Sequence, residues 1–114
     1  MRIEMGNIEE VVNLIEKRWG MFLLERKLDY LYQFLFGLSF NEEQEINTYF
    51  WNNFHDFSVN YISQKRANYS KSSDNWCYEI RNVCNNEEEE LELFFAIFKE
   101  FMDYFHKIDK VYEI

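Results

Sequence analysis

The sequence has no proline and only three glycines among its 114 residues. Proline and glycine are the residues that most often mark turns, and a β-sandwich or β-barrel needs many turns. Their scarcity therefore argues against these two architectures. Apolar residues make up 47% of the chain, which argues against disorder as well. We expect a single folded domain over residues 1–114 with a hydrophobic core of its own.

Long hydrophobic runs are also absent. No stretch approaches the roughly 20 apolar residues that cross a bilayer, and Met1–Gly6 lacks the apolar segment of a signal peptide. If their segment is helical, the two cysteines, Cys77 and Cys84, lie roughly 10 Å apart along the axis. A disulfide needs Cα atoms within about 7 Å. We therefore expect two reduced thiols in a cytoplasmic protein that does not enter a membrane.

Positive charge is scarce, since 12 Lys and Arg stand against 21 Asp and Glu and give a net charge of −9. A field of this sign repels nucleic acids and attracts basic partners. The acidic residues are concentrated in two blocks. Residues 41–60 hold four of them with no Lys or Arg, and residues 85–114 hold nine against three lysines. The basic residues of segment 61–84 exceed its acidic residues by only two, which is too few to predict nucleic-acid binding.

The residue sets that catalysis or metal binding requires are missing from the sequence. The three glycines are too far apart to form a phosphate-binding loop. His55 and Asp56 are adjacent, and adjacent helical residues point about 100° apart, which argues against a shared metal ion. His55 also falls opposite the stripe of Phe50, Phe54 and Phe57, so we expect it to be exposed. Neither Cys77 nor Cys84 has a histidine nearby in sequence to act as its base. We expect no enzyme activity, no cofactor and no metal site.

Apolar residues recur at helical spacing in five segments, which predicts an all-α bundle. The first segment opens at Asn7, which with Glu10 fits a capping box, and it fades near Trp19–Gly20. A short apolar connector follows. The second segment covers about residues 26–36 and stops at Gly37.

The third segment begins after Asn41, which with Gln44 again fits a capping box. Its apolar stripe consists of Ile46, Phe50, Phe54, Phe57 and Tyr61. Residues 65–74 are polar and indicate a loop. Residues 76–84 fit either a helix or a strand, because their apolar residues satisfy both periods.

The last segment has the clearest helical pattern. Asn86 can cap it together with Glu89, and residues 87–90 are all glutamates, which the positive end of a helix dipole favours. Its apolar residues cover most of its circumference and are Leu91, Leu93, Phe94, Phe95, Ile97, Phe98, Phe101, Met102, Tyr104 and Phe105. A helix of this kind has neighbours on several sides. We therefore expect this Phe-rich C-terminal helix at the centre of a compact single-domain bundle.

Two groups of residues are candidate partner-binding sites. The first lies on the third segment and comprises Glu42, Glu45, Trp51 and Asp56. An exposed Trp among acidic residues is typical of an interface anchor, but Trp51 can equally pack under a neighbouring helix. The second group comprises Glu87, Glu88, Glu89, Glu90 and Glu92. These side chains can dock a basic protein, or they can serve only to complement the helix dipole.

The run Ile15–Leu23, the Leu- and Phe-rich helix after it, and Trp76 with Ile80 before an acidic helix start form an ordered pattern. This pattern resembles that of small bacterial immunity proteins of toxin systems, including contact-dependent growth inhibition. Trp19 stands where the pattern has proline, and Leu24 where it has glycine. The resemblance implies a cytoplasmic inhibitor that binds one basic, nuclease-type toxin domain through an acidic surface, without catalytic residues of its own.

Two further functions fit the same composition. An acidic helical scaffold or regulatory module that self-associates, for example as a homodimer, would use the abundant aromatic residues in its own interface. A mimic of DNA would need its carboxylates in spaced rows. The oligomeric state in solution separates the self-associating module from the toxin inhibitor.

Overall fold

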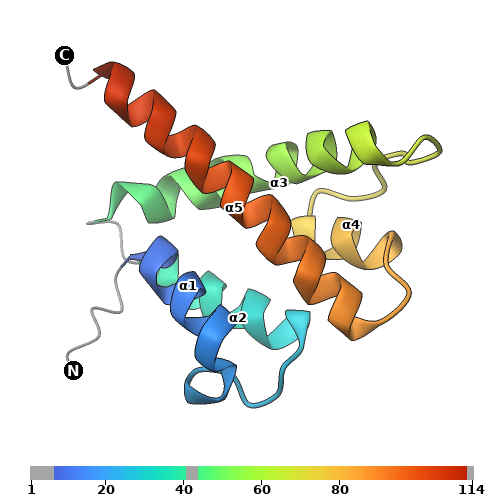
Figure 1. Ribbon diagram of the computed structural model, residues 1–114, viewed down its shortest axis with the longest axis horizontal. Coiled ribbons are helices and arrows are strands. Elements are labelled where there is room, and N and C mark those ends of the chain that lie inside the picture. The colour runs from blue at the N-terminus through green and yellow to red at the C-terminus, as the bar shows by residue number, and fades with distance from the viewer. Residues whose placement is uncertain (1–6, 41–43, 113–114) are drawn as a thin grey trace. The chain divides into compact units, whose positions relative to one another are not determined.

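The computed structural model describes residues 7–40 and 44–112, and all regular structure in these ranges is helical. The elements are α1 (Ile8–Arg18), a 3₁₀ turn (Trp19–Met21), α2 (Leu28–Leu38), α3 (Glu45–Lys65), α4 (Trp76–Asn82) and α5 (Glu87–Tyr112) (Figure 1). The prediction of an all-α protein with about five helices is confirmed, and the segment that fitted both helix and strand is the helix α4. The chain divides into two compact units, Met1–His55 and Asp56–Ile114. The expectation of one domain over residues 1–114 stays a prediction.

The start of α1 is fixed by the cap that the sequence predicts. The side-chain oxygen of Asn7 accepts hydrogen bonds from the backbone N–H groups of Glu9 at 2.9 Å and Glu10 at 3.3 Å. These bonds satisfy donors that have no partner inside the helix. The residues that α1 buries are Ile8, Val11, Val12 and Ile15. They recur at helical spacing, so the local pattern and the observed core agree.

Helix α2 does not stop at Gly37, and this prediction is wrong. The helix runs through Gly37 to Leu38, and no described glycine has a positive φ. At the helix end, the carbonyl oxygen of Phe36 accepts hydrogen bonds from both the hydroxyl of Ser39 at 2.6 Å and its backbone N–H at 3.1 Å. The residues that α2 buries are Leu28, Leu31, Leu35 and Leu38. The helix continues to the last of these leucines because the buried stripe does.

A buried amide side chain joins three helices of the unit Met1–His55. Asn47 of α3 is completely buried. Its side-chain oxygen accepts from the backbone N–H of Ile8 at 2.9 Å, and its side-chain nitrogen donates to the carbonyl oxygen of Leu38 at 3.4 Å. Asn47 therefore fixes the first residue of α1 and the last residue of α2 to the start of α3.

The buried side of α3 agrees with the prediction only in its first half. Ile46, Phe50 and Phe54 are buried as expected. Phe57 and Tyr61 are only half-buried, and Ser58 and Ile62 are buried in their place. Each step of four residues turns about 40° around a helix, so a stripe that continues in steps of four moves gradually to another side. The predicted cap at Asn41 lies outside the described residues.

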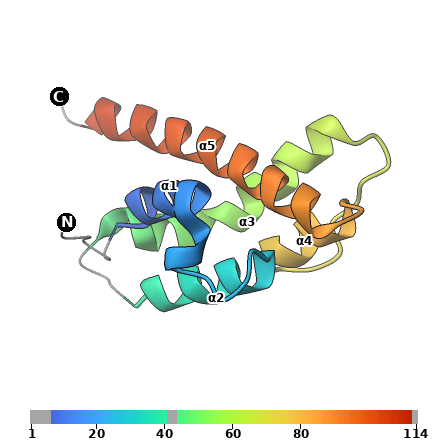
Figure 2. The same cartoon turned by 60° about the horizontal axis from the view of Figure 1, so that its bottom comes forward.

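In the unit Asp56–Ile114, α5 contacts both of the other helical segments. The ring centroids of Trp76 in α4 and Phe94 are 5.2 Å apart, and those of Phe57 in α3 and Phe101 are 5.3 Å apart in an edge-to-face arrangement. Figures 1 and 2 both show α4 beside the first turns of α5. The buried side chains of α5 are Leu91, Phe94, Ile97, Phe98, Phe101 and Met102. Within this unit, the Phe-rich helix thus contacts two other segments along one side, because Phe94 and Phe101 are seven residues apart and lie on the same face of the helix.

The start of α5 combines two backbone caps with an ion pair. The side-chain oxygen of Asn86 accepts from the backbone N–H of Glu89 at 2.9 Å, as predicted. The Glu89 carboxylate accepts in turn from the backbone N–H of Asn85 at 2.9 Å, one residue earlier than in a standard capping box. Nε of Arg81 lies 3.3 Å from the carboxylate of Glu90 and connects α4 to α5.

Glu79 of α4 is completely buried and organises the loop that precedes the helix. Its carboxylate accepts from the backbone N–H groups of Ser72 at 2.9 Å and Ser73 at 2.6 Å, and the Tyr69 hydroxyl donates to it as well. Burial raises the pKa of Glu79, but these hydrogen bonds outweigh burial and hold the pKa below its ordinary value of 4.5. Burial, together with the bond to the carboxylate, raises the pKa of Tyr69.

Replacement of the buried amide should destabilise the fold. Asn47→Ala leaves the N–H of Ile8 and the carbonyl of Leu38 without their side-chain partner, so we expect the free energy of unfolding to fall by about 2 kcal/mol. Asn52→Ala is the matched control, because Asn52 is an exposed residue of the same helix. Urea denaturation of both variants measures the difference. Equal stability of the two variants would contradict the role of Asn47.

The contribution of Glu79 should depend on pH. A carboxylate whose pKa is lowered by folding stabilises the protein above its unfolded pKa, and that contribution disappears as the pH falls through the folded pKa. We expect Glu79→Gln to cost about 2 kcal/mol at neutral pH. The difference from wild type should shrink as the pH falls below 4.5. Denaturation over this pH range checks the prediction, with the exposed Glu92→Gln as control. A difference that does not vary with pH would contradict it.

Candidate partner-binding surfaces

Four aromatic side chains form a continuous row in the unit Met1–His55. Three pairs of rings meet edge to face, with centroid distances of 5.5 Å for Phe36–Phe40, 5.8 Å for Phe36–Trp51 and 5.7 Å for Tyr32–Trp51. We call these four residues the aromatic row. Phe36 is 49% exposed and Phe40 is 73% exposed. Adjoining exposed aromatic rings of this kind are typical of interaction sites, whereas single exposed apolar residues are ordinary.

Trp51 is the inner member of the row rather than its exposed anchor. Its indole N–H donates to the carbonyl oxygen of Leu35 in α2 at 3.1 Å, and the ring is half-buried. Of the two alternatives that the sequence left open, packing under a neighbouring helix is therefore the observed one. The exposed rings are those of Phe36 and Phe40, neither of which is a predicted site residue. Their spacing of four residues, outside the leucine stripe of α2, is the signal that could have identified them.

The acidic candidates of the third predicted segment do not form one described cluster. Glu45 is exposed at the start of α3 and belongs, with Trp51, to the unit Met1–His55. Asp56 is also exposed, and it belongs to the other unit. Glu42 lies outside the described residues. Of the described members of this group, Trp51 and Glu45 therefore belong to one unit and Asp56 to the other. Trp51 contacts other aromatic residues rather than these acidic ones.

The expectation that His55 is exposed is wrong. The residue is half-buried, and both ring nitrogens are buried without a hydrogen-bond partner among the described residues. Its helical position matches that of Ile62, seven residues later, which is also buried. The prediction failed because it assumed that the buried stripe of α3 keeps to one side.

The five glutamates at the start of α5 divide into two kinds. Glu89 and Glu90 are half-buried, and they bind Asn85 and Arg81 within their own unit. Glu87, Glu88 and Glu92 are exposed.

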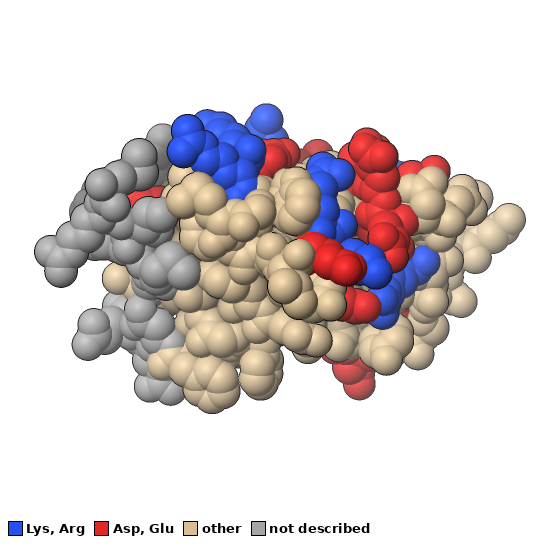
Figure 3. All heavy atoms as spheres, turned by 90° about the horizontal axis from the view of Figure 1, so that it is seen from below, with Lys and Arg blue, Asp and Glu red and all other residues tan. Residues whose placement is uncertain are grey.

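The face of the molecule in Figure 3 carries basic as well as acidic side chains, and broad areas of it carry neither. The negative charge is therefore accompanied by lysine and arginine on this face, and the exposed acidic residues of α5 are fewer than its sequence suggests.

The described residues also bear on metal, membrane and thiol chemistry. No group of three or more His, Cys, Asp or Glu among them could hold a metal ion. No helix in the same ranges has both the length and the apolar character that a membrane span requires. Both cysteines are free thiols, as expected. Burial raises the pKa of the Cys84 thiol; the charges of Glu90 and Glu89 add to this, and Arg66 opposes it.

No family model, no curated protein and no solved structure matches this chain. We therefore infer its function from the residues themselves. Two features of the described surface are the aromatic row in one unit and the exposed glutamates of α5 in the other. Both are suited to contact with a macromolecule.

The raised pKa of Cys84 predicts a slow thiol. The thiolate is the reactive form, so the alkylation rate at neutral pH should fall below that of an unperturbed cysteine. The rate can be measured in the Cys77→Ser variant by alkylation with iodoacetamide from neutral to alkaline pH. The reaction is quenched at set times and the product is quantified by mass spectrometry. The rate should still be rising with pH above 9.0, the ordinary value for this group. A plateau below that pH would contradict the prediction.

Proposed function

We propose that the protein is an immunity protein, which binds and neutralises a basic, nuclease-type toxin domain in the bacterial cytoplasm. The observation that carries this proposal is the aromatic row. Phe36 and Phe40 expose two large rings to solvent, and the half-buried ring of Trp51 packs edge to face against Phe36. Aromatic side chains that become fully desolvated dominate the affinity of many protein interfaces.

The negative charge of the protein favours a positively charged partner. The net charge of −9 and the exposed glutamates Glu45, Glu87, Glu88 and Glu92 attract a basic surface. A nuclease domain is basic because it must hold a polyanion. Opposite charge speeds the encounter and fixes the orientation, and the desolvated aromatic rings slow dissociation. The resemblance to immunity proteins of toxin systems suggests such a partner, namely a basic toxin domain.

Self-association is the second candidate, and the same exposed rings support it. Phe36 and Phe40 on two copies could cover each other in a symmetric dimer, since a two-fold interface uses one patch twice. Sedimentation of the purified protein separates the two functions. A monomer favours a different protein as partner. A dimer that Phe40→Ser converts to a monomer favours the self-associating scaffold.

The test uses the protein encoded directly upstream of this gene as the probe. Coexpression should rescue growth if that protein is the toxin, and the purified pair should form a complex. Phe36→Ala combined with Phe40→Ala should weaken the complex at least about 30-fold, because each truncation removes an anchor of the interface. The control is Leu24→Ala, which shortens an apolar side chain of the same unit that is 82% exposed and outside the aromatic row.

Two outcomes would overturn the proposal. If the upstream protein neither inhibits growth nor binds, the assignment as an immunity protein fails. If it binds and the double variant binds as tightly as Leu24→Ala, the aromatic row is not the docking surface. Circular dichroism of the double variant shows whether its fold is intact. We expect an intact fold, because both rings are exposed in the wild-type protein.

A further inference from the structure

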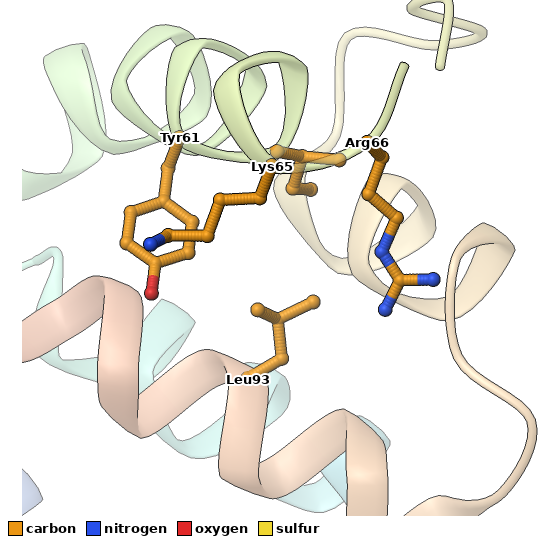
Figure 4. A pocket seen from close by; sticks show the side chains of 5 residues that line it. Tyr61, Lys65, Arg66 and Leu93 are labelled. Atoms are coloured by element: carbon orange, nitrogen blue, oxygen red, sulfur yellow. The ribbon is translucent and has the colours of Figure 1, made fainter. Parts of the chain in front are cut away.

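A hollow of about 440 Å³ opens beside the last turn of α3, and it belongs entirely to the unit Asp56–Ile114. Its lining residues are Tyr61, Ile62, Lys65, Arg66 and Leu93. Figure 4 shows Lys65 running beside α3 to the ring of Tyr61 and Arg66 extending on the other side of the hollow, with Leu93 of α5 below and between their charged ends. The hollow therefore combines an apolar lining with two cations at its rim.

The two cations at the rim have no carboxylate partner among the described residues. The ammonium group of Lys65 lies 5.0 Å from the ring centroid of Tyr61, within the range of a cation–π interaction. Arg66 is exposed. On α5, the carboxylates about one turn before Leu93 are those of Glu89 and Glu90, which bind Asn85 and Arg81 instead. Two adjacent unneutralised cations are a notable feature in a protein with a net charge of −9.

We propose that this hollow binds a small organic carboxylate with an apolar body. The carboxylate would bind the Arg66 guanidinium, which can donate two parallel hydrogen bonds to it, and the ammonium group of Lys65 on the other side of the hollow would add to the positive potential. The apolar body would lie against Tyr61 and Leu93. Ligand pockets of this volume commonly combine an apolar lining with a few polar groups that orient the ligand. The site lies in the other unit from the aromatic row and does not depend on the proposed partner.

The probe is 4-phenylbutyrate, titrated into ¹⁵N-labelled protein. We expect saturable chemical-shift changes at the backbone amides of Tyr61, Arg66 and Leu93. The neutral 4-phenylbutanamide has the same apolar body and should bind at least about tenfold more weakly, because it lacks the charge that strengthens the hydrogen bonds. Inorganic phosphate tests whether the anion alone is sufficient, and we expect no saturable change at Leu93.

Arg66→Gln should weaken the binding of 4-phenylbutyrate by about tenfold. Lys99→Gln is the matched control, because it removes one positive charge from an exposed position of α5 outside the hollow. It should change the affinity less than twofold. Equal weakening by both variants would show that the overall charge of the protein, and not the position of Arg66, affects binding. This result would overturn the proposal. Absence of shifts up to the solubility limit of the probe, or equal binding of the amide, would overturn it as well.

Discussion

A polar group that leaves water costs free energy unless it meets the requirement for hydrogen-bond partners inside the protein, and in each unit a buried side chain that meets this requirement joins separate segments. An unpartnered amide or carboxylate in the interior would cost several kcal/mol, comparable to a large part of the stability of a small domain. Asn47 satisfies the requirement by holding the start of α1 and the end of α2. Glu79 satisfies it by drawing two serine amides and a tyrosine hydroxyl onto α4. The apolar packing of each unit is arranged around these fixed points.

The abundance of aromatic residues has two structural consequences. Most of the phenylalanines of α3 and α5 are buried, where they join the leucine, isoleucine and valine side chains of the core, and their ring pairs are edge to face, tilted or stacked. Other aromatic rings remain at the surface. In one unit they form the aromatic row, and in the other Tyr61 forms a wall of the hollow beside Lys65. The same residue type thus supplies both the core and the candidate binding surfaces.

Much of the helical architecture could be predicted from the sequence, because helical spacing and capping are local. Asn7 and Asn86 cap the helices that they were expected to cap. Gly37 failed as a stop, because a residue with weak helix preference is overridden when the buried stripe extends to Leu38. The inner side of α3 changes along its length, and only tertiary contacts determine where.

The candidate surfaces were harder to predict than the helices, because exposure depends on what a neighbouring element covers. The sequence of α3 allowed Trp51 to be an exposed anchor, but its indole N–H donates a hydrogen bond to α2 and its ring is half-buried. Phe36 and Phe40 are exposed, although no local pattern in the sequence selected them as site residues. Glu79 is a single acidic residue in the mixed segment 76–84, and its burial depends on the preceding loop, whose residues Tyr69, Ser72 and Ser73 donate hydrogen bonds to it.

The attachment of that loop to Glu79 has a consequence for motion in the unit Asp56–Ile114. Residues 66–75 contain no helix or strand and are mostly exposed, which would ordinarily make such a segment exchange its amide hydrogens quickly. The N–H groups of Ser72 and Ser73, however, are bound to a carboxylate carried by α4. These two amides can exchange only when their hydrogen bonds to Glu79 break. Their rate of hydrogen exchange therefore reports how often the loop detaches from the carboxylate of α4.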